Sequence, residues 1–158
     1  MGHAHHSGKI AQIRQALRSA KSPARMMIII AMQDTDSKVT SDFLAASVGV
    51  NPVIIRKTLS QLKKAGLISV ARGTGGTEII KDLQDISLLD VYQAVECLGK
   101  SGKLFSFHDN PNPNCPIGAN IHAVLDQKLF DVQAAMENQL RQTSLAQVVA
   151  DAQNKLSK

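Results

Sequence analysis

The sequence predicts a mainly α-helical fold that contains one small β-hairpin and a long helix near its C-terminus. Between Val39 and Ile80, two short helical patterns are followed by two short apolar runs around a glycine-rich tip. From Ile117 onward, apolar residues recur at helical spacing over about 24 residues, the longest such pattern in the chain. A helix, a turn, a second helix and a hairpin in this order predict a winged helix-turn-helix with a small hairpin wing.

The first helix of the pair is expected to begin at Thr40 or Ser41, either of which can cap it. Gly49 follows its last apolar residue, at the position where a left-handed glycine often ends a helix. The apolar side of this helix is assigned to Phe43, Leu44 and Val48.

The second helix is predicted from a cap, a proline and two faces of different character. Asn51 can cap it, and Pro52 occupies the first helical position, where a missing N–H is harmless. An apolar stripe at helical spacing is formed by Ile55, Leu59 and Leu62. The other surface is polar and basic, and Gly66 ends the helix. A helix that is apolar behind and basic in front suits the DNA major groove.

The hairpin that follows is the predicted wing, with strands at Leu67–Ala71 and Thr77–Ile80. Glycines at its tip permit a sharp turn, and Arg72 could reach a phosphate or a narrow minor groove. A solvated hairpin with an incidental arginine is the alternative. The candidate DNA-binding residues of helices and wing together are Thr40, Ser41, Asn51, Pro52, Val53, Arg56, Lys57, Ser60, Lys63, Lys64, Arg72, Gly73, Thr74 and Gly75.

The placement of charge indicates a polyanionic partner. Residues 1–86 contain 12 Lys and Arg against 6 Asp and Glu, whereas residues 87–158 contain 6 against 7. Basic groups at a DNA-binding surface release counterions from the nucleic acid, which favours this arrangement. Ordinary solubilising charge does not predict such an asymmetry. Double-stranded DNA is therefore the expected partner.

Length and composition limit the other possibilities. At 158 residues, 44% of them apolar, the chain has room for one folded domain, or for one domain with an appended dimerisation arm. No apolar run is long enough to span a bilayer and no signal-peptide pattern opens the chain, so we expect a cytoplasmic protein without membrane contact. Two cysteines are too few for a disulfide framework.

Three regions are expected along the chain. Residues 1–8 form a tag-like or disordered start, and a metal site at its three histidines is the alternative. Residues 9–86 form the DNA-binding domain, which opens with a basic amphipathic helix over 9–21. A buried helix over 24–32 follows, although its three consecutive isoleucines would also suit a strand. Residues 87–158 form a sensor loop and a helical dimerisation region.

Within this last region, Asp85 or Ser87 is expected to cap a helix whose buried side contains Leu88, Leu89, Val91, Val95 and Leu98. Residues 104–118 have the composition of a loop, rich in Asn and Pro. Thr143 or Ser144 is expected to cap a last short helix.

The long helix between that loop and that cap carries an apolar stripe that a small domain does not need for its own core. Pairing with a second copy would bury the stripe and give a two-fold homodimer on a palindromic operator. The alternative packs the stripe back on its own domain. The predicted dimerisation residues are Ile121, Leu125, Leu129, Val132, Met136 and Leu140.

Five ordered motifs are similar to those of one family of bacterial regulators. They are TSDFLA (residues 40–45), VNPVIIRK (50–57), KAGLI (64–68), RGTGG (72–76) and ISLLDVY (86–92). Over about residues 23–150 the chain resembles the Rrf-two (BadM/IscR-like) family. The resemblance implies a homodimeric winged-helix protein, usually a repressor, with a long C-terminal dimerisation helix. It also implies DNA contacts from the recognition helix and from an arginine at the wing tip.

Some members of that family hold an iron–sulfur cluster on three closely spaced cysteines, and this chain departs from that pattern. It contains only Cys97 and Cys115, with His108 and His122 as the nearest other soft ligands. A cluster normally needs four ligands, mostly thiolates, so we expect no cofactor. A cluster on the two cysteines and a histidine, or one bridged between subunits, is the alternative.

The segment from Phe105 to Gly118 resembles instead the clusterless YwnA-like branch of the family. Cys115 precedes the long helix, a position that can raise the reactivity of a thiol. The predicted sensing residues are Cys115, His108 and Cys97, and the predicted effector is an oxidant, an electrophile or a small molecule. A packed loop cysteine is the alternative for Cys115.

Other classes of function fit the sequence less well. A winged helix used for protein–protein assembly would not need the basic face. The glycine-rich tip lacks the Lys-Ser or Lys-Thr of a phosphate-binding loop. His108 and Cys115 could mimic a Cys/His pair, but no third orienting group accompanies them. We therefore expect no enzyme activity and no metal site.

Overall fold

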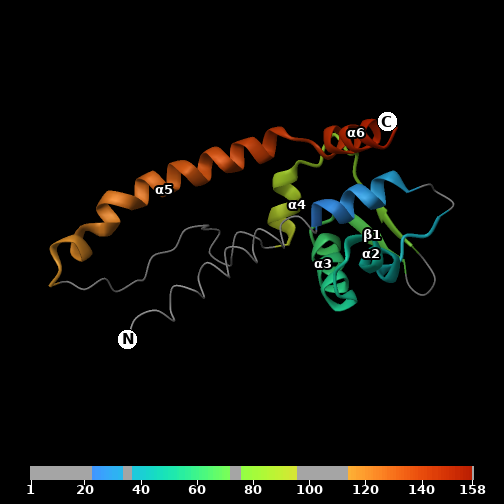
Figure 1. Cartoon of the computed structure of the whole chain (residues 1–158), viewed down its shortest axis with the longest axis horizontal. Coiled ribbons are helices and arrows are strands. Elements are labelled where there is room, and N and C mark those ends of the chain that lie inside the picture. Colours follow the sequence, from blue (N-terminus) through green and yellow to red (C-terminus); the bar gives the residue numbers. More distant parts are fainter. Residues whose placement is uncertain (1–22, 34–36, 72–75, 96–113, 158) are drawn as a thin grey trace.

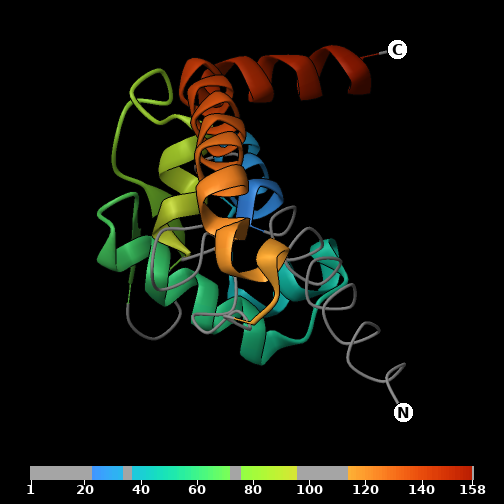
Figure 2. The same ribbon diagram turned by 90° about the vertical axis from the view of Figure 1, so that its left-hand side faces the viewer.

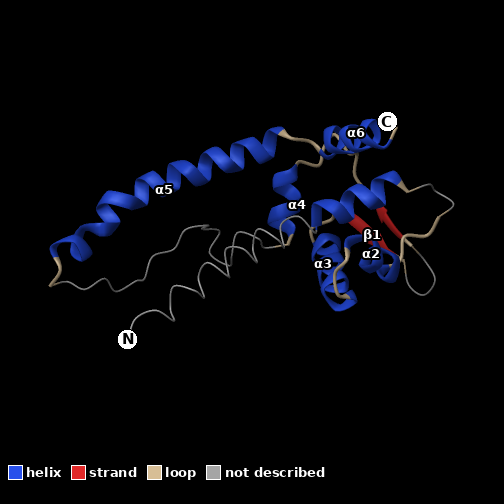
Figure 3. Cartoon of the chain, in the orientation of Figure 1, coloured by secondary structure: helices blue, strands red, loops and turns tan. Residues whose placement is uncertain are grey.

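The computed structural model of the chain describes residues 23–33, 37–71, 76–95 and 114–157. The predicted helix over 9–21, the histidine-rich start, the wing tip and most of the predicted loop lie outside these ranges. The described part is mainly helical, with one small two-stranded sheet (Figures 1 and 3). After a helix over residues 23–32 come α2 (Ser41–Val48), α3 (Pro52–Lys64), β1 (Ile68–Val70), β2 (Thr77–Ile79), α4 (Leu88–Ala94), α5 (Pro116–Gln142) and α6 (Leu145–Leu156).

Side-chain caps and a left-handed glycine determine where the two helices of the predicted helix-turn-helix begin and end. Thr40, not Ser41, is the cap of α2, and its Oγ1 accepts the Phe43 N–H at 3.2 Å. Gly49 ends α2 in the left-handed region, at φ 71°. The Asn51 side chain accepts the Val53 N–H at 2.8 Å and caps α3. The prediction of this unit from the sequence is confirmed.

The core of the winged helix lies behind α2 and α3, on the helix over residues 23–32. This segment is a helix, so the alternative of a strand at its isoleucines is wrong, and Met26 and Met27 are fully buried in it. They share one apolar cluster with residues of α2 and α3, including Leu44, Ile55 and Leu62. The prediction for Phe43 was wrong. The Phe43 side chain is 42% exposed, and the buried side of α2 contains Ala45 together with Leu44 and Val48.

The wing is an antiparallel pair in which Ile68 lies opposite Ile79 and Val70 opposite Thr77. Both strands are shorter than predicted. The Thr77 N–H donates to the Val39 carbonyl at 3.0 Å, so the chain entering α2 is bonded to the start of β2. The end of the strand pair that lies nearer the wing tip is thereby held against the segment that leads into α2.

Two capping boxes define the helices on either side of α5. Ser87, not Asp85, caps α4, and its side chain pairs with the backbone and carboxylate of Asp90. Ser144, not Thr143, caps α6: its Oγ accepts the Gln147 N–H, and the Gln147 side chain accepts the Ser144 N–H. Of the predicted buried side of α4, Leu89 and Val91 are buried, whereas Leu98 lies outside the described residues.

The long helix α5 has 27 residues and starts at Pro116, so the predicted loop ends at Cys115 and not at Gly118. It extends away from the winged helix (Figure 1), and α6 then runs across its direction (Figure 2). None of its described side chains is fully buried. Within the described ranges, no helix is long and apolar enough to cross a membrane.

Candidate nucleic-acid interface

The exposed surface of α3 is the best candidate for contact with DNA. Its buried side contains Ile55, Thr58, Leu59 and Leu62. On the outward side, every polar and basic residue predicted to contact DNA is exposed. We call this surface the α3 face; it consists of Pro52, Val53, Arg56, Lys57, Ser60, Lys63 and Lys64. The helical spacing thus brings all seven predicted residues onto one side of one helix.

The caps next to the α3 face keep part of their hydrogen-bonding capacity. Thr40 is exposed, and its oxygen accepts a backbone N–H, so its hydroxyl hydrogen can still be donated. Asn51 is exposed and uses its carbonyl oxygen for capping, which leaves its amide N–H groups for a partner. Ser41 is only partly exposed. Hydroxyl and amide donors of this kind commonly contact phosphate oxygens.

One acidic side chain accompanies the basic residues. Arg56 Nη2 donates to Asp42 Oδ1 at 3.2 Å, an ion pair that joins α3 to the first turn of α2. Asp42 is not among the residues that the sequence predicts to contact DNA. Fourteen positions separate the two residues, so no helical periodicity links them. Only the crossing of the two helices brings them together.

Apolar side chains add to the exposed surface of α2 and α3. Val53 is 68% exposed and Ile54 is 52% exposed, next to the α3 cap. Apolar groups on a recognition helix can contact the methyl group of thymine. Val53 was predicted as a DNA-binding residue, whereas Phe43 was assigned to the apolar side of its helix and Ile54 was given no role.

Several predicted site residues lie outside the described part of the chain. These are Arg72, Gly73, Thr74 and Gly75 of the wing tip, and Cys97 and His108. Cys115 is described: it is exposed and stands at the N-cap of α5, where its side chain makes no capping hydrogen bond. The predicted position of Cys115 at the start of the long helix is confirmed.

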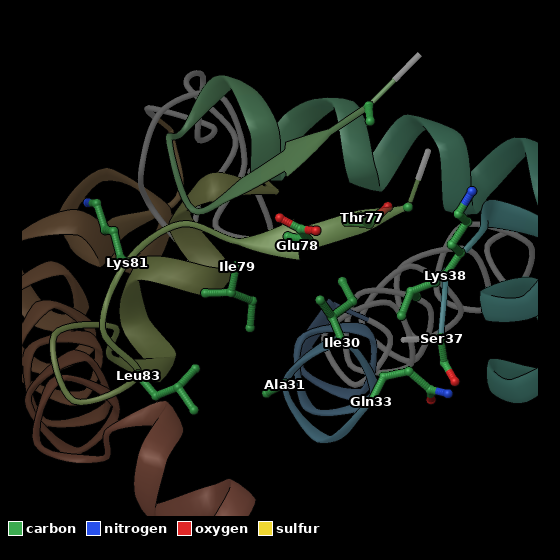
Figure 4. A pocket seen from close by; sticks show the side chains of 13 residues that line it. Ile30, Ala31, Gln33, Ser37, Lys38, Thr77, Glu78, Ile79, Lys81 and Leu83 are labelled. Carbon is green, nitrogen blue, oxygen red and sulfur yellow. The ribbon is translucent and has the colours of Figure 1, made fainter. Parts of the chain in front are cut away.

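A cavity of about 660 Å³ lies on another side of the domain, between the helix over residues 23–32 and β2 (Figure 4). Ile30, Ala31, Ile79 and Leu83 provide apolar lining, and Lys38, Glu78 and Lys81 provide charged groups. The α3 face contributes no residue to this cavity, and neither does α4 or α5. It is therefore separate from the candidate interface and from Cys115.

Comparison with known proteins agrees with this geometry. A model of the Rrf2 family, described as an iron-dependent transcriptional regulator, matches residues 17–151. The chain belongs to the Rrf2 family. It is 44% identical over 121 residues to the Bacillus subtilis (strain 168) protein YwnA, which is provisionally named an HTH-type transcriptional regulator. That match covers 77% of this chain and 89% of YwnA.

Solved structures show the same fold. One, described as a candidate DNA-binding protein, is 38% identical and covers 80% of this chain and 97% of its own, with a TM-score of 0.61. T. potens IscR has a TM-score of 0.62 at 20% identity, covering 85% of each chain. B. subtilis CymR, the global cysteine regulator, has a TM-score of 0.60 at 18% identity and covers 84% of this chain and 93% of its own. As a member of the Rrf2 family, the chain is a winged helix-turn-helix, DNA-binding transcriptional regulator.

The family description raises the question of iron, and the donor atoms of this Rrf2 protein do not match a four-thiolate cluster. The whole sequence has two cysteines, half the usual number of thiolate ligands. In the described ranges, no three His, Cys, Asp or Glu side chains gather in a group that could hold a metal ion.

Proposed function

We propose that this Rrf2 protein is a repressor that binds a palindromic operator as a homodimer and releases it in response to an oxidant, an electrophile or a small molecule. The observation that supports the DNA-binding part most directly is the α3 face. Seven exposed residues, four of them basic, lie opposite a buried stripe that is apolar except for Thr58. This division suits a recognition helix in the major groove.

The proposed contacts divide into two kinds. Arg56 lies in the N-terminal half of α3, where side chains of a recognition helix reach base edges. Lys63 and Lys64 lie in its last turn, where they would contact phosphates. Thr40 and Asn51, at the starts of α2 and α3, would position the helices on the backbone.

The proposed homodimer rests on α5. Five of the six predicted dimerisation residues are only partly covered within one chain, and Val132 is 54% exposed. A second copy would bury this stripe, since α5 is about 40 Å long at 1.5 Å per residue and projects from the domain. Two recognition helices could then read half-sites that are about 34–36 Å apart.

The proposed sensor is Cys115, with Cys97 and His108 as further candidates. Its exposure makes it accessible to a reagent, and it stands where α5 begins. The other end of α5 leads directly into the cap of α6, which is bonded to the winged helix. A displacement of α5 would therefore change the separation of the two recognition helices and lower operator affinity.

The decisive experiment enriches operator sequences from a randomised duplex library with the purified protein. We expect one two-fold motif, bound at least tenfold more tightly than poly(dI-dC). Arg56→Ala should remove most of this preference, whereas Arg141→Ala, which deletes the same charge on α5, should not. Failure to enrich any sequence would favour a protein–protein module instead. Equal effects of the two substitutions would show that the α3 face does not recognise the operator sequence.

A second candidate is an iron–sulfur-dependent regulator of the same fold, which is favoured by the description of the family model. The visible absorbance of protein purified without oxygen distinguishes it. Absorbance of a cluster would replace the thiol proposal. A colourless protein with a specific operator would leave thiol or small-molecule sensing.

A further inference from the structure

The ion pair between Asp42 and Arg56 places a negative charge beside a surface that is proposed to meet a polyanion. Asp42 is the only acidic residue in the sequence between Ser37 and Thr77. Its carboxylate accepts a hydrogen bond from Arg56 Nη2 at 3.2 Å, and the side chains are 77% and 60% exposed. The single carboxylate of this segment is thus directed at the arginine in the middle of the α3 face.

Folding stability does not account for this arrangement well. Ion pairs between exposed side chains contribute little to stability, because solvent and salt screen the attraction. Asp42 also lies in the first turn of α2, where a negative charge is favourable. That role requires a carboxylate at the helix end, but it does not require contact with Arg56.

We propose that Asp42 determines specificity by holding the Arg56 guanidinium in the orientation that reads guanine and by keeping it from phosphates. The inference rests on the proposed function, in which α3 enters the major groove. Asp42 is a positioning residue in this proposal, and its effect on DNA is transmitted through Arg56.

On operator DNA, Arg56 can satisfy both partners at once. An arginine has several N–H donors in a planar fork, and the contact with Asp42 occupies only one of those on Nη2. The remaining donors can bind O6 and N7 of a guanine in the bidentate geometry. The carboxylate fixes the plane of the fork, and its free lone pairs can accept from the amino group of a neighbouring cytosine.

On non-specific DNA, the same pair acts against binding. Such complexes are held by phosphate contacts, each of which steepens the dependence of affinity on salt. Arg56 would have to leave Asp42 to contact a phosphate, and Asp42 would then remain close to the backbone without a partner. The pair therefore lowers non-specific affinity more than operator affinity.

The test compares two probes, the duplex enriched by the wild-type protein and poly(dA-dT), which contains no guanine, over a series of KCl concentrations. Asp42→Asn keeps the shape of the side chain and removes its charge. Because Arg56 becomes free for phosphates, we expect poly(dA-dT) binding to tighten about threefold to tenfold and its log–log salt slope to steepen by about one per subunit. The operator preference should fall about tenfold.

Two controls separate this proposal from simpler explanations. Asp151→Asn removes the same charge on α6, where the residue is exposed, and should leave both probes unaffected. In an Arg56→Ala background, Asp42→Asn should change the salt slope no further. Thermal unfolding of each variant shows that the fold is retained.

An unchanged slope and preference in Asp42→Asn would overturn the proposal. An effect that persists without Arg56 would also overturn it, since plain repulsion between Asp42 and DNA would then suffice. Failure of the wild-type protein to enrich any duplex is a different result, because it contradicts the proposed function before Asp42 is tested.

Discussion

Ser87 and Ser144 pair as an antiparallel β-bridge that joins the start of α4 to the start of α6. Each serine is also the cap of its helix. On either side of the bridge, the Leu88 N–H donates to the Thr143 carbonyl at 2.9 Å and the Leu145 N–H donates to the Ile86 carbonyl at 2.7 Å. The C-terminal end of α5 is therefore attached to the winged helix through backbone hydrogen bonds.

This attachment predicts a large loss of stability when Leu145 is truncated. Its side chain is fully buried in the core cluster that also contains Ile86. Leu145→Ala should lower the free energy of unfolding by about 2–5 kcal/mol, because it leaves a cavity. Leu156→Ala in the same helix is the matched control, since Leu156 is 77% exposed, and its effect should stay within about 0.5 kcal/mol. Urea denaturation measures both, and equal effects would contradict the placement of α6.

The turn between α2 and α3 makes a separate prediction about Gly49. It has φ 71°, and a Cβ at this position would meet nothing within 4 Å, so only backbone strain opposes a side chain. Gly49→Ala should therefore destabilise the protein by about 1–2 kcal/mol. Gly49→Asn should cost less, because asparagine tolerates the left-handed region. Thermal unfolding of the two variants and the wild-type protein measures these differences in stability. An alanine variant as stable as wild type would show that the turn adopts another conformation.

The features that the sequence predicted correctly are mostly local. Asn51 was predicted as a cap, and Thr40 and Ser144 were each predicted as one of two neighbouring caps, because such side chains bond to backbone groups two or three residues away. The left-handed Gly49 follows from the only residue type that adopts φ > 0 without a steric penalty. Such interactions depend on a few neighbouring residues, so a single sequence is enough to predict them.

What the sequence did not predict depends on how helices pack. Phe43 was assigned to the core because it is large and apolar, but the crossing of α2 over its neighbours leaves it 42% exposed. Leu145 is fully buried where the β-bridge between Ser87 and Ser144 holds the start of α6 against the winged helix. The contact of Asp42 with Arg56 arises in the same way. The α3 face itself was predicted because a buried stripe determines which side of a helix is exposed.

Lys63 should contribute to DNA affinity without contributing to sequence preference. It lies at the C-terminal end of the α3 face and is exposed, where a phosphate contact is proposed. Lys63→Ala should weaken operator and poly(dI-dC) binding alike, and it should reduce the salt slope by about one per subunit. Lys155→Ala removes an exposed lysine from α6 and should change neither quantity. A loss confined to the operator would mean that Lys63 reads a base.

The proposed dimer makes a prediction about the two sides of α5. Leu125 belongs to the dimerisation stripe and is partly exposed, whereas Phe130 is 67% exposed and lies on a different side of the helix. Leu125→Glu should convert the dimer to a monomer, because a charge cannot be buried between two apolar stripes without a partner. Phe130→Glu should leave the dimer intact. Sedimentation equilibrium distinguishes the outcomes, and dissociation by Phe130→Glu alone would assign the interface to the wrong side.

Alkylation of Cys115 should weaken operator binding if the start of α5 is the sensor. N-ethylmaleimide adds a bulky group at the N-cap of α5, next to Pro116 at its first position. We expect operator affinity to fall about tenfold or more, since the displacement would reach the winged helix through the bridge between Ser87 and Ser144. Cys115→Ser should bind the operator normally and be insensitive to the reagent, whereas Cys97→Ser should remain sensitive. If alkylated protein binds as tightly as untreated protein, thiol sensing at Cys115 is wrong and the effector must act elsewhere.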